Sequence, residues 1–193
     1  MSYNFYAFLN RMKYIKRWSL MHNVKEENIM EHSQNVAVIA HALAEIGNVF
    51  FGENNDSAKI ALIALFHESG EVITGDLPTP IKYYNKDINK AYKNLEDLAE
   101  NKLLGMLPPE LAEAYSGIIK ADKSSPEYKI VKTADKLAAY IKCLEELKSG
   151  NGEFKKAESQ IKTELEKIDL PALRYFNEHF LESYSLTLDE LDM

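Results

Sequence analysis

Apolar residues recur at the spacing of an α-helix along most of the chain, and no segment shows the strict alternation that is typical of a β-strand. Each such set of apolar residues forms a stripe along one side of a candidate helix, and we expect that side to be buried. The stripes are Phe5, Phe8, Leu9, Met12 and Ile15; His32, Val36, Ile39 and Leu43; Ile60, Ile63, Ala64 and His67; Ile88, Ala91, Tyr92, Leu95 and Leu98; Val131, Ala134, Leu137, Ala138, Ile141 and Leu144. Shorter stretches cover 111–119, 157–165 and 173–180. The pattern predicts an all-α fold, a compact bundle of several helices.

Residue types that begin helices stand at the edges of two stripes. Asp56 or Ser57 can cap the helix that carries His67, because both side chains accept hydrogen bonds from free backbone N–H groups. Ser125 and Pro126 are the types preferred at the cap and at the first position of a helix. The helix that they open is predicted to reach Lys148.

Glycine and proline predict where helices end. Gly47 offers an end to the helix that contains His32. The segment 74–80 contains Gly75, Pro78 and Pro80, and we expect it to have no regular structure. The chain shows no repeat and no linker long enough to separate domains, so we expect residues 1–193 to form one domain.

Composition excludes several classes of protein. Of 193 residues, 46% are hydrophobic and 27% are charged, which is typical of a folded globular domain. With 23 Lys and Arg against 30 Asp and Glu, the net charge is −7, which argues against a partner that is polymeric nucleic acid. Cys143 is the only cysteine, so an internal disulfide and a cysteine-based zinc site are excluded. Without a secretory signal or the roughly 18 apolar residues that span a bilayer, we expect a cytoplasmic protein with no membrane partner.

Ionisable side chains occupy positions where a buried stripe would favour apolar residues. They are His32, His67 with Glu68 and Glu71 close behind it, and Asp135 between Val131 and Ala138. An unpaired buried carboxylate costs several kcal/mol. Imidazoles and carboxylates from three helices could instead converge on one divalent metal ion, such as zinc, manganese, cobalt or iron. The residues alone leave another interpretation open, in which the histidines are hydrogen-bonded core residues and Asp135 pairs with Lys132 or Lys136.

The order His32, His67-Glu68, Asp135 resembles the signature of the HD-domain metal-dependent phosphohydrolases. Further motifs are similar to the YfbR-type bacterial 5′-deoxynucleotidases: RWSLM at 17–21, EHS at 31–33, ALFHESGEVITGDLPTPIKYYN at 64–85, and KTADKLAAYIKCLEEL at 132–147. The resemblance covers nearly the whole chain. It implies an all-helical HD fold, a homodimer, and hydrolysis of deoxyribonucleoside 5′-monophosphates to nucleoside and phosphate.

The resemblance also implies roles for individual residues. It makes His32, His67, Glu68 and Asp135 the ligands of a divalent metal ion, which would be cobalt, manganese, zinc or a similar ion. It implies that Arg17 binds the phosphate of the substrate and that the carboxylate of Glu71 takes part in catalysis. The substrate is implied to lie against Trp18, the loop residues Asp76, Leu77, Pro78 and Thr79, and the ligands His32 and Asp135.

The chain departs from the family at one ligand, because Glu68 stands where the family has aspartate. Glutamate keeps the charge but places its oxygens about 1.5 Å further from the backbone, whereas coordination distances tolerate about 0.2 Å. Two alternatives therefore stay open. Beside the 5′-deoxynucleotidase that the resemblance implies, the chain is then another HD phosphohydrolase, acting on a nucleoside triphosphate or a cyclic phosphodiester, or a nucleotide-binding HD module with weakened catalysis.

The net charge does not argue against a small phosphate ligand, because whole-chain charge says little about one site. Glu68, Glu71 and Asp135 would collect a cation before they repelled a phosphate. That cation and Arg17 would supply the positive charge. A single nucleotide therefore stays compatible with the composition.

Overall fold

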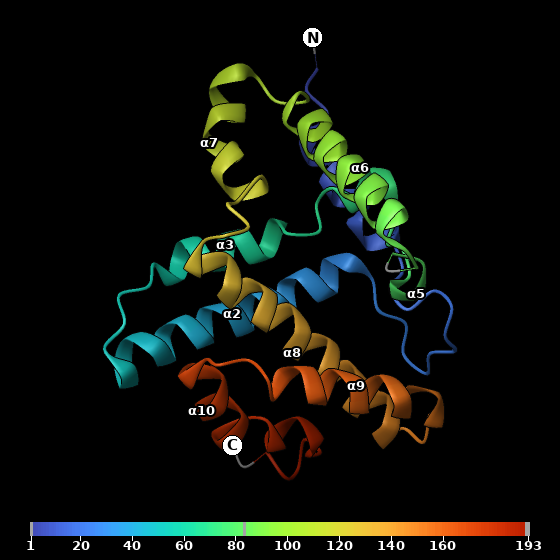
Figure 1. Ribbon diagram of the computed structural model, residues 1–193, viewed down its shortest axis with the longest axis vertical. Coiled ribbons are helices and arrows are strands. Elements are labelled where there is room, and N and C mark those ends of the chain that lie inside the picture. Colours follow the sequence, from blue (N-terminus) through green and yellow to red (C-terminus); the bar gives the residue numbers. More distant parts are fainter. Residues whose placement is uncertain (1, 83, 192–193) are drawn as a thin grey trace.

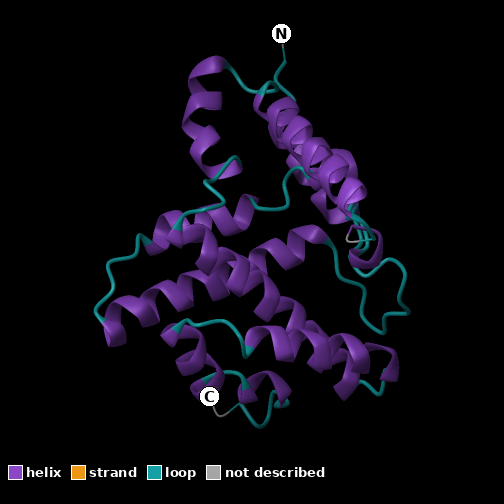
Figure 2. Ribbon diagram, viewed as in Figure 1, coloured by secondary structure: helices purple, strands orange, loops and turns teal. Residues whose placement is uncertain are grey.

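A computed structural model describes residues 2–82 and 84–191 of the chain. Its helices are α1 (Phe5–Leu9), α2 (Ile29–Phe51), α3 (Ser57–Phe66), α4 (Glu71–Thr74), α5 (Thr79–Lys82), α6 (Lys86–Leu104), α7 (Pro109–Ile119), α8 (Pro126–Lys148), α9 (Lys155–Leu165) and α10 (Pro171–His179). Single 3-10 turns cover Asn10–Tyr14, Gly152–Phe154 and Glu182–Ser185. The described residues form no β-strand, so the all-α prediction is confirmed (Figure 2).

Three helices form the centre of the molecule. α2 packs against both α3 and α8, while α9 packs on α8 and α10 on α2. Figure 1 shows α6 and α7 at the end that holds the N-terminus, and α9 and α10 at the opposite end. Because α2 contacts both α3 and α8, side chains from all three helices can meet at one point.

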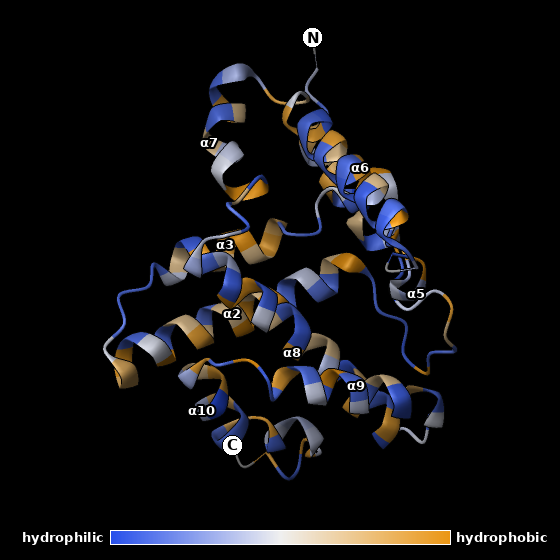
Figure 3. Cartoon of the chain, in the orientation of Figure 1, coloured by the Kyte–Doolittle hydropathy of each residue, from blue (hydrophilic) through white to orange (hydrophobic). Residues whose placement is uncertain are grey.

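The core lies where the apolar stripes of the central helices face one another. Val36 and Leu43 of α2, Ile60 of α3, Leu137 of α8 and Leu173 of α10 are each at most 1% exposed. Burying one such side chain stabilises the fold by about 1.5–3 kcal/mol. Figure 3 shows hydrophilic and hydrophobic residues interspersed along the helices. Accordingly, no helix in the described part of the chain is both long and apolar enough to span a lipid bilayer.

The helix starts that the sequence predicts are confirmed. The Asp56 carboxylate accepts a hydrogen bond from the N–H of Lys59 at 2.9 Å, at the start of α3. The Ser125 hydroxyl accepts one from the N–H of Tyr128 at 3.1 Å, and α8 extends to Lys148 as expected. Each cap satisfies a backbone donor that the first helical turn leaves free.

The predicted end of α2 at Gly47 is wrong. The helix continues to Phe51 and ends at Gly52, whose φ of +69° is the left-handed conformation that favours glycine. Gly47 is buried within the helix, and a Cβ there would lie 2.4 Å from Oε2 of Glu53. The missing side chain at Gly47 therefore makes room for the loop that follows α2, and it does not end the helix.

Two further expectations are corrected. The segment 74–80 is not wholly irregular, because α5 begins at Thr79 with Pro80 in its first turn, where a missing N–H breaks no helical hydrogen bond. On α6, Leu95 and Leu98 are 45% and 66% exposed, although they belong to the predicted stripe. Of the predicted stripe this helix buries Tyr92, and it also buries Ala99 and Leu103, which lie beyond that stripe.

A buried ion pair fixes the segment that precedes α2. Lys142 and Glu146 of α8 are 4% and 2% exposed, and the Lys142 ammonium donates to Glu146 and to the carbonyl of Lys25. The Glu146 carboxylate accepts the N–H groups of Val24 at 2.9 Å and Lys25 at 3.1 Å. Burial alone would raise the pKa of Glu146, but Lys142 and Asn151 lower it to about 2. Residues 24–25 are thus held to α8 by charge-assisted hydrogen bonds.

We expect Glu146→Gln to lower the free energy of unfolding by about 3 kcal/mol, because it leaves the Lys142 ammonium buried without a counter-charge. Urea unfolding followed by circular dichroism measures this. The matched control is Glu145→Gln, an exposed neighbour on the same helix, which should change stability by less than about 0.5 kcal/mol. Equal losses in the two variants would contradict the anchoring role.

Candidate active site

Four side chains meet where α2, the end of α3 and α8 come together. His32 lies on α2, His67 and Glu68 follow α3 directly, and Asp135 lies on α8. Each offers one ligand atom, and these atoms all lie within 4.8 Å of one another. His32 is fully buried and Glu68 is 9% exposed, so the group is largely shielded from water. The structure therefore brings together the four residues that the sequence predicts as metal ligands.

The distances within this group suit a metal ion. His32 Nε2 lies 3.0 Å from Asp135 Oδ1 and 3.6 Å from Glu68 Oε1. His67 Nε2 lies 3.8 Å from Glu68 Oε1 and 3.9 Å from Asp135 Oδ1. Ligands about 2.1 Å from a tetrahedral zinc ion lie roughly 3.4 Å apart. The donor set, two imidazoles and two carboxylates, is one that zinc, manganese and cobalt accept.

Unpaired buried atoms support the same fit. His67 Nε2 and Glu68 Oε2 are buried and have no hydrogen-bond partner among the described residues. The other ring nitrogen of His67, Nδ1, lies 2.6 Å from the carbonyl of Ala64. If Nδ1 donates its proton there, Nε2 presents its lone pair to the group, as in most metal-binding histidines.

The His67-Glu68 pair lies in a tight turn, which corrects the expectation that the helix continues through it. α3 ends at Phe66, and the N–H of Glu71, the first residue of α4, donates to the carbonyl of Glu68 at 2.9 Å. His67 and Glu68 therefore lie beyond the last helical residue of α3. Glu68 reaches the group from this turn, with its Oε1 3.6 Å from Nε2 of His32.

Asp135 stays ionised in this setting. Burial alone would raise its pKa, but the Lys132 ammonium, the hydrogen bond with His32 and the nearby His67 imidazole hold it well below its usual range. One part of the alternative interpretation is thus present, because Lys132 does pair with Asp135. Lys136 pairs with Glu164 instead. The pairing with Lys132 does not exclude a metal ligand, because it engages Oδ2 while Oδ1 faces the histidines.

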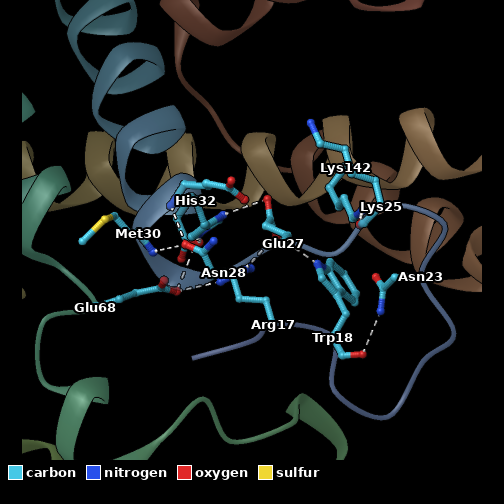
Figure 4. Close-up of polar contacts among 12 residues, drawn as sticks. Arg17, Trp18, Asn23, Lys25, Glu27, Asn28, Met30, His32, Glu68 and Lys142 are labelled. Carbon is cyan, nitrogen blue, oxygen red and sulfur yellow. Dashed lines mark hydrogen bonds and ion pairs between the residues drawn. The ribbon is translucent and has the colours of Figure 1, made fainter. Parts of the chain in front are cut away.

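Arg17 lies beside Glu68 and His32, two members of this group (Figure 4). Its Nη1 donates to Glu68 Oε1 at 2.7 Å, and its Nε donates to Glu27 Oε2 at 3.0 Å. Burial alone would lower its pKa, but the carboxylates of Glu68, Asp135 and Glu27 raise it above the ordinary value. Nη2 makes no hydrogen bond to the described residues, so this edge of the guanidinium is free to bind an anion.

Trp18 has a strained backbone, with a φ of +55°, and is the only described residue other than glycine with a positive φ. Such a conformation costs about 1–3 kcal/mol and persists where surrounding contacts fix it. Here the Trp18 carbonyl accepts the N–H of Met21 at 2.9 Å, and the ring centroid lies 5.2 Å from that of Phe154. The indole N–H donates to Glu27 Oε2 at 3.3 Å. The strain indicates a side chain that is held in a defined position next to Arg17.

Glu71 is half-buried but lies outside the group of four ligand atoms. Burial raises its pKa to about 9, and the nearby carboxylates of Glu68 and Asp76 add to this effect. Its Oε2 is buried without a partner among the described residues. The side chain therefore carries a proton at neutral pH in the metal-free protein.

The loop between α4 and α5 lies next to these residues. Burial raises the pKa of Asp76, while the Arg17 guanidinium opposes that shift. Leu77 and Pro78 are half-buried, and Thr79 is exposed at the start of α5. Asp76 is thus the member of the predicted substrate loop whose charge interacts with the site.

The sequence does not single out Glu27, which contacts Arg17 and Trp18. It belongs to a run of charged residues, 25–27, which is typical of an exposed turn. The one usable signal is its position directly before Asn28, which caps α2 by accepting the N–H groups of Met30 and Glu31. A side chain at that position is fixed by the start of the helix.

Solved structures of HD-domain proteins share this fold. An HD-domain phosphohydrolase from Listeria innocua has a TM-score of 0.82 at 22% identity, covering 94% of this chain and 88% of that one. The HD phosphohydrolase of cyanophage S-2L, solved with dA and one catalytic Zn²⁺ ion, has a TM-score of 0.64 at 19% identity, covering 92% and 96%. At these identities the likeness concerns the fold.

Sequence comparison is more specific. The 5′-deoxynucleotidase of Shewanella oneidensis is 47% identical over 188 residues, which are 97% of this chain and 96% of that protein. The 5′-deoxynucleotidase YfbR of Escherichia coli O127:H6 is 48% identical over 189 residues, 97% and 95% of the two chains. The model of the family described as 5′-deoxynucleotidase YfbR-like matches residues 4–184. The chain therefore belongs to the YfbR-like family of 5′-deoxynucleotidases within the HD-domain fold.

Proposed function

We propose that this protein is a metal-dependent 5′-deoxynucleotidase, which hydrolyses deoxyribonucleoside 5′-monophosphates to the nucleoside and phosphate. The observation that carries the proposal is the hydrogen bond from Arg17 Nη1 to Oε1 of Glu68 at 2.7 Å, because Glu68 is one of the four clustered side chains. It puts an anion-binding guanidinium beside a group fit for a cation. The activities named for the relatives at 47% and 48% identity support the same reaction.

His32, His67, Glu68 and Asp135 would hold the divalent metal ion, for which we propose zinc, cobalt or manganese. When bound, such an ion neutralises phosphate charge and lowers the pKa of a coordinated water towards neutrality. The two imidazoles and two carboxylates contribute a net charge of about −2, which the ion balances. His32 and Asp135 then also border the phosphate that the site receives.

Arg17 binds the phosphate in this proposal. Its planar guanidinium matches phosphate oxygens with paired N–H donors, which a lysine ammonium does not. Two of its nitrogens are engaged by Glu68 and Glu27, so the group is already oriented before substrate arrives. Preorganised donors of this kind stabilise charge that develops in the transition state.

Glu71 acts as the general acid in this proposal. Its proton is held because burial raises its pKa to about 9, so the protonated form is the main species at neutral pH. The leaving group of a 5′-monophosphate is an alkoxide, which needs a proton to depart. A carboxylic acid with a raised pKa can supply that proton.

Trp18 and the loop residues Asp76, Leu77, Pro78 and Thr79 would bind the nucleoside. The fixed indole of Trp18 offers an apolar face for the base or sugar, and Asp76 offers an acceptor for a sugar hydroxyl. The dA bound by the cyanophage HD phosphohydrolase supports a deoxynucleoside as ligand of this fold. The homodimer stays a prediction from the family resemblance, and the cytoplasmic location stays a prediction from the sequence.

The proposal is tested by phosphate release from nucleoside 5′-monophosphates in the presence of zinc, cobalt, manganese or magnesium. We expect turnover of deoxyribonucleotides, and a loss of about 100-fold or more in Arg17→Lys, because lysine cannot bind phosphate through a planar fork. Release of pyrophosphate from triphosphates, or cleavage of cyclic diesters, would indicate another HD phosphohydrolase. Binding without turnover would contradict the enzymatic proposal.

We expect Glu68→Asp to weaken zinc binding by about tenfold or more, although aspartate is the usual family residue. Here Glu68 Oε1 lies within 3.8 Å of Nε2 of each histidine and 2.7 Å from Nη1 of Arg17. A shorter side chain would move this oxygen away from the histidines and from Arg17. Calorimetric titration of the metal-free protein with zinc measures the effect. Glu178→Asp, at an exposed position on α10, is the control. Equal or tighter binding in Glu68→Asp would show that Glu68 is a poor ligand.

The raised pKa of Glu71 predicts a pH dependence of stability in the metal-free protein. Because the folded-state pKa of about 9 exceeds the ordinary 4.5, the unfolded state loses this proton first. The contribution of Glu71 is therefore fully present below pH 4.5 and is lost as pH rises through about 9. Urea unfolding with a chelator should show this decline in the wild type relative to Glu71→Gln, which stays neutral. Parallel pH curves for the two proteins would contradict the raised pKa.

A further inference from the structure

Glu27 contacts three residues of the site from one position. It lies in the segment before α2, and its side chain is 11% exposed. Oε2 accepts hydrogen bonds from Nε of Arg17 at 3.0 Å and from Nε1 of Trp18 at 3.3 Å. Oε1 lies 3.9 Å from Nδ1 of His32 (Figure 4). The two oxygens of this carboxylate thus face different parts of the site.

The two histidines differ in what their Nδ1 atoms contact. Nδ1 of His67 lies 2.6 Å from the Ala64 carbonyl, whereas Nδ1 of His32 is buried and has no hydrogen-bond partner among the described residues. A metal-binding histidine almost always donates its other ring N–H to a carboxylate or carbonyl. Glu27 Oε1 needs to approach by about 1 Å to become that acceptor. It would then fix the His32 ring with Nε2 directed at Asp135 and Glu68.

Glu27 also holds Arg17 and Trp18 in place through two kinds of contact. Its backbone carbonyl accepts the N–H of Arg17 at 2.9 Å, while its side chain accepts from the guanidinium. Contacts of its backbone and its ring hold Trp18 in the positive-φ conformation. Among them, the hydrogen bond to Glu27 is the one that the indole N–H donates. A single carboxylate therefore holds both the charged side chain of Arg17 and the aromatic side chain of Trp18.

We propose that Glu27 is a positioning residue that aligns Arg17, Trp18 and His32 with one another. It couples the placement of the phosphate-binding guanidinium, the nucleoside-binding indole and one metal ligand, and it makes no contact with the reacting atoms. The roles given to these three residues rest on the proposed function. A displacement of about 1 Å in such groups can lower catalysis on the order of 100-fold.

Glu27→Gln tests the proposal, because the amide has nearly the same shape but cannot accept at both oxygen positions. Either the Arg17 and Trp18 donors or the His32 N–H must then face an NH₂ group. Glu26→Gln is the matched control, since Glu26 is the adjacent glutamate, is 68% exposed and pairs only with Lys16 among the described residues. Glu27→Asp keeps the charge but shortens the side chain, so it should show smaller effects.

Three readouts are measured on the full chain. Zinc affinity of the metal-free protein should fall about tenfold or more in Glu27→Gln. Tryptophan fluorescence, excited at a wavelength that tyrosine does not absorb, reports Trp18 alone because it is the only tryptophan of the chain, and its emission should shift. With a deoxyribonucleoside 5′-monophosphate as substrate, kcat/KM should fall on the order of 100-fold. Glu26→Gln should leave all three unchanged.

Zinc affinity and Trp18 emission do not depend on turnover, so they test Glu27 even if the wild type hydrolyses no nucleotide. Circular dichroism first establishes that each variant keeps the helical content of the wild type. Wild-type zinc affinity and emission in a folded Glu27→Gln protein would overturn the proposal. Loss of the fold in both Glu27 variants would overturn it in favour of a purely structural role.

Discussion

The fold is built around a cluster of buried charges that apolar packing alone would not tolerate. Glu68 and Asp135 face each other across two histidines, with the ligand atoms of all four within 4.8 Å. Like charges at this separation repel strongly in a medium of low dielectric constant. The chain offsets part of the repulsion through Arg17 and Lys132, which contact one carboxylate each. His67 Nε2 and Glu68 Oε2, which are buried without hydrogen-bond partners among the described residues, are atoms that a cation would accept as ligands.

Rigid packing beneath the cluster keeps these charges together. α2 contributes one histidine, and its buried stripe packs on both of the helices that supply the other ligands. The segment from Arg17 to Asn28 has no such stripe, so polar contacts fix it instead. Glu146 binds its backbone at residues 24–25, and Glu27 binds its side chains at residues 17–18. Helix packing therefore places the proposed metal ligands, whereas buried carboxylates place the proposed substrate-binding residues.

This division explains how much the sequence could predict. The bounds of α8 and the cap at Asp56 follow from local chemistry, and the polar residues within apolar stripes indicate the cluster correctly. Gly47 misleads because a glycine that admits a neighbouring loop looks the same in sequence as one that ends a helix. Leu95 and Leu98 mislead because periodicity identifies an apolar face without showing whether another element covers it. Glu27 escapes notice because its contacts lie in an irregular segment, where no periodicity relates sequence to space.

The glutamate at position 68 is compensated locally. In a continuing helix, an extra methylene would carry the carboxylate past its ligand position, or displace the helix. α3 ends at Phe66, however, so Glu68 leaves from a turn whose backbone can accommodate the longer side chain. Its Oε1 lies 2.7 Å from Nη1 of Arg17 and 3.6 Å from Nε2 of His32. One carboxylate oxygen thus joins the proposed cation site to the proposed anion site, and the orientation of Arg17 depends on the same atom that the metal ion would bind.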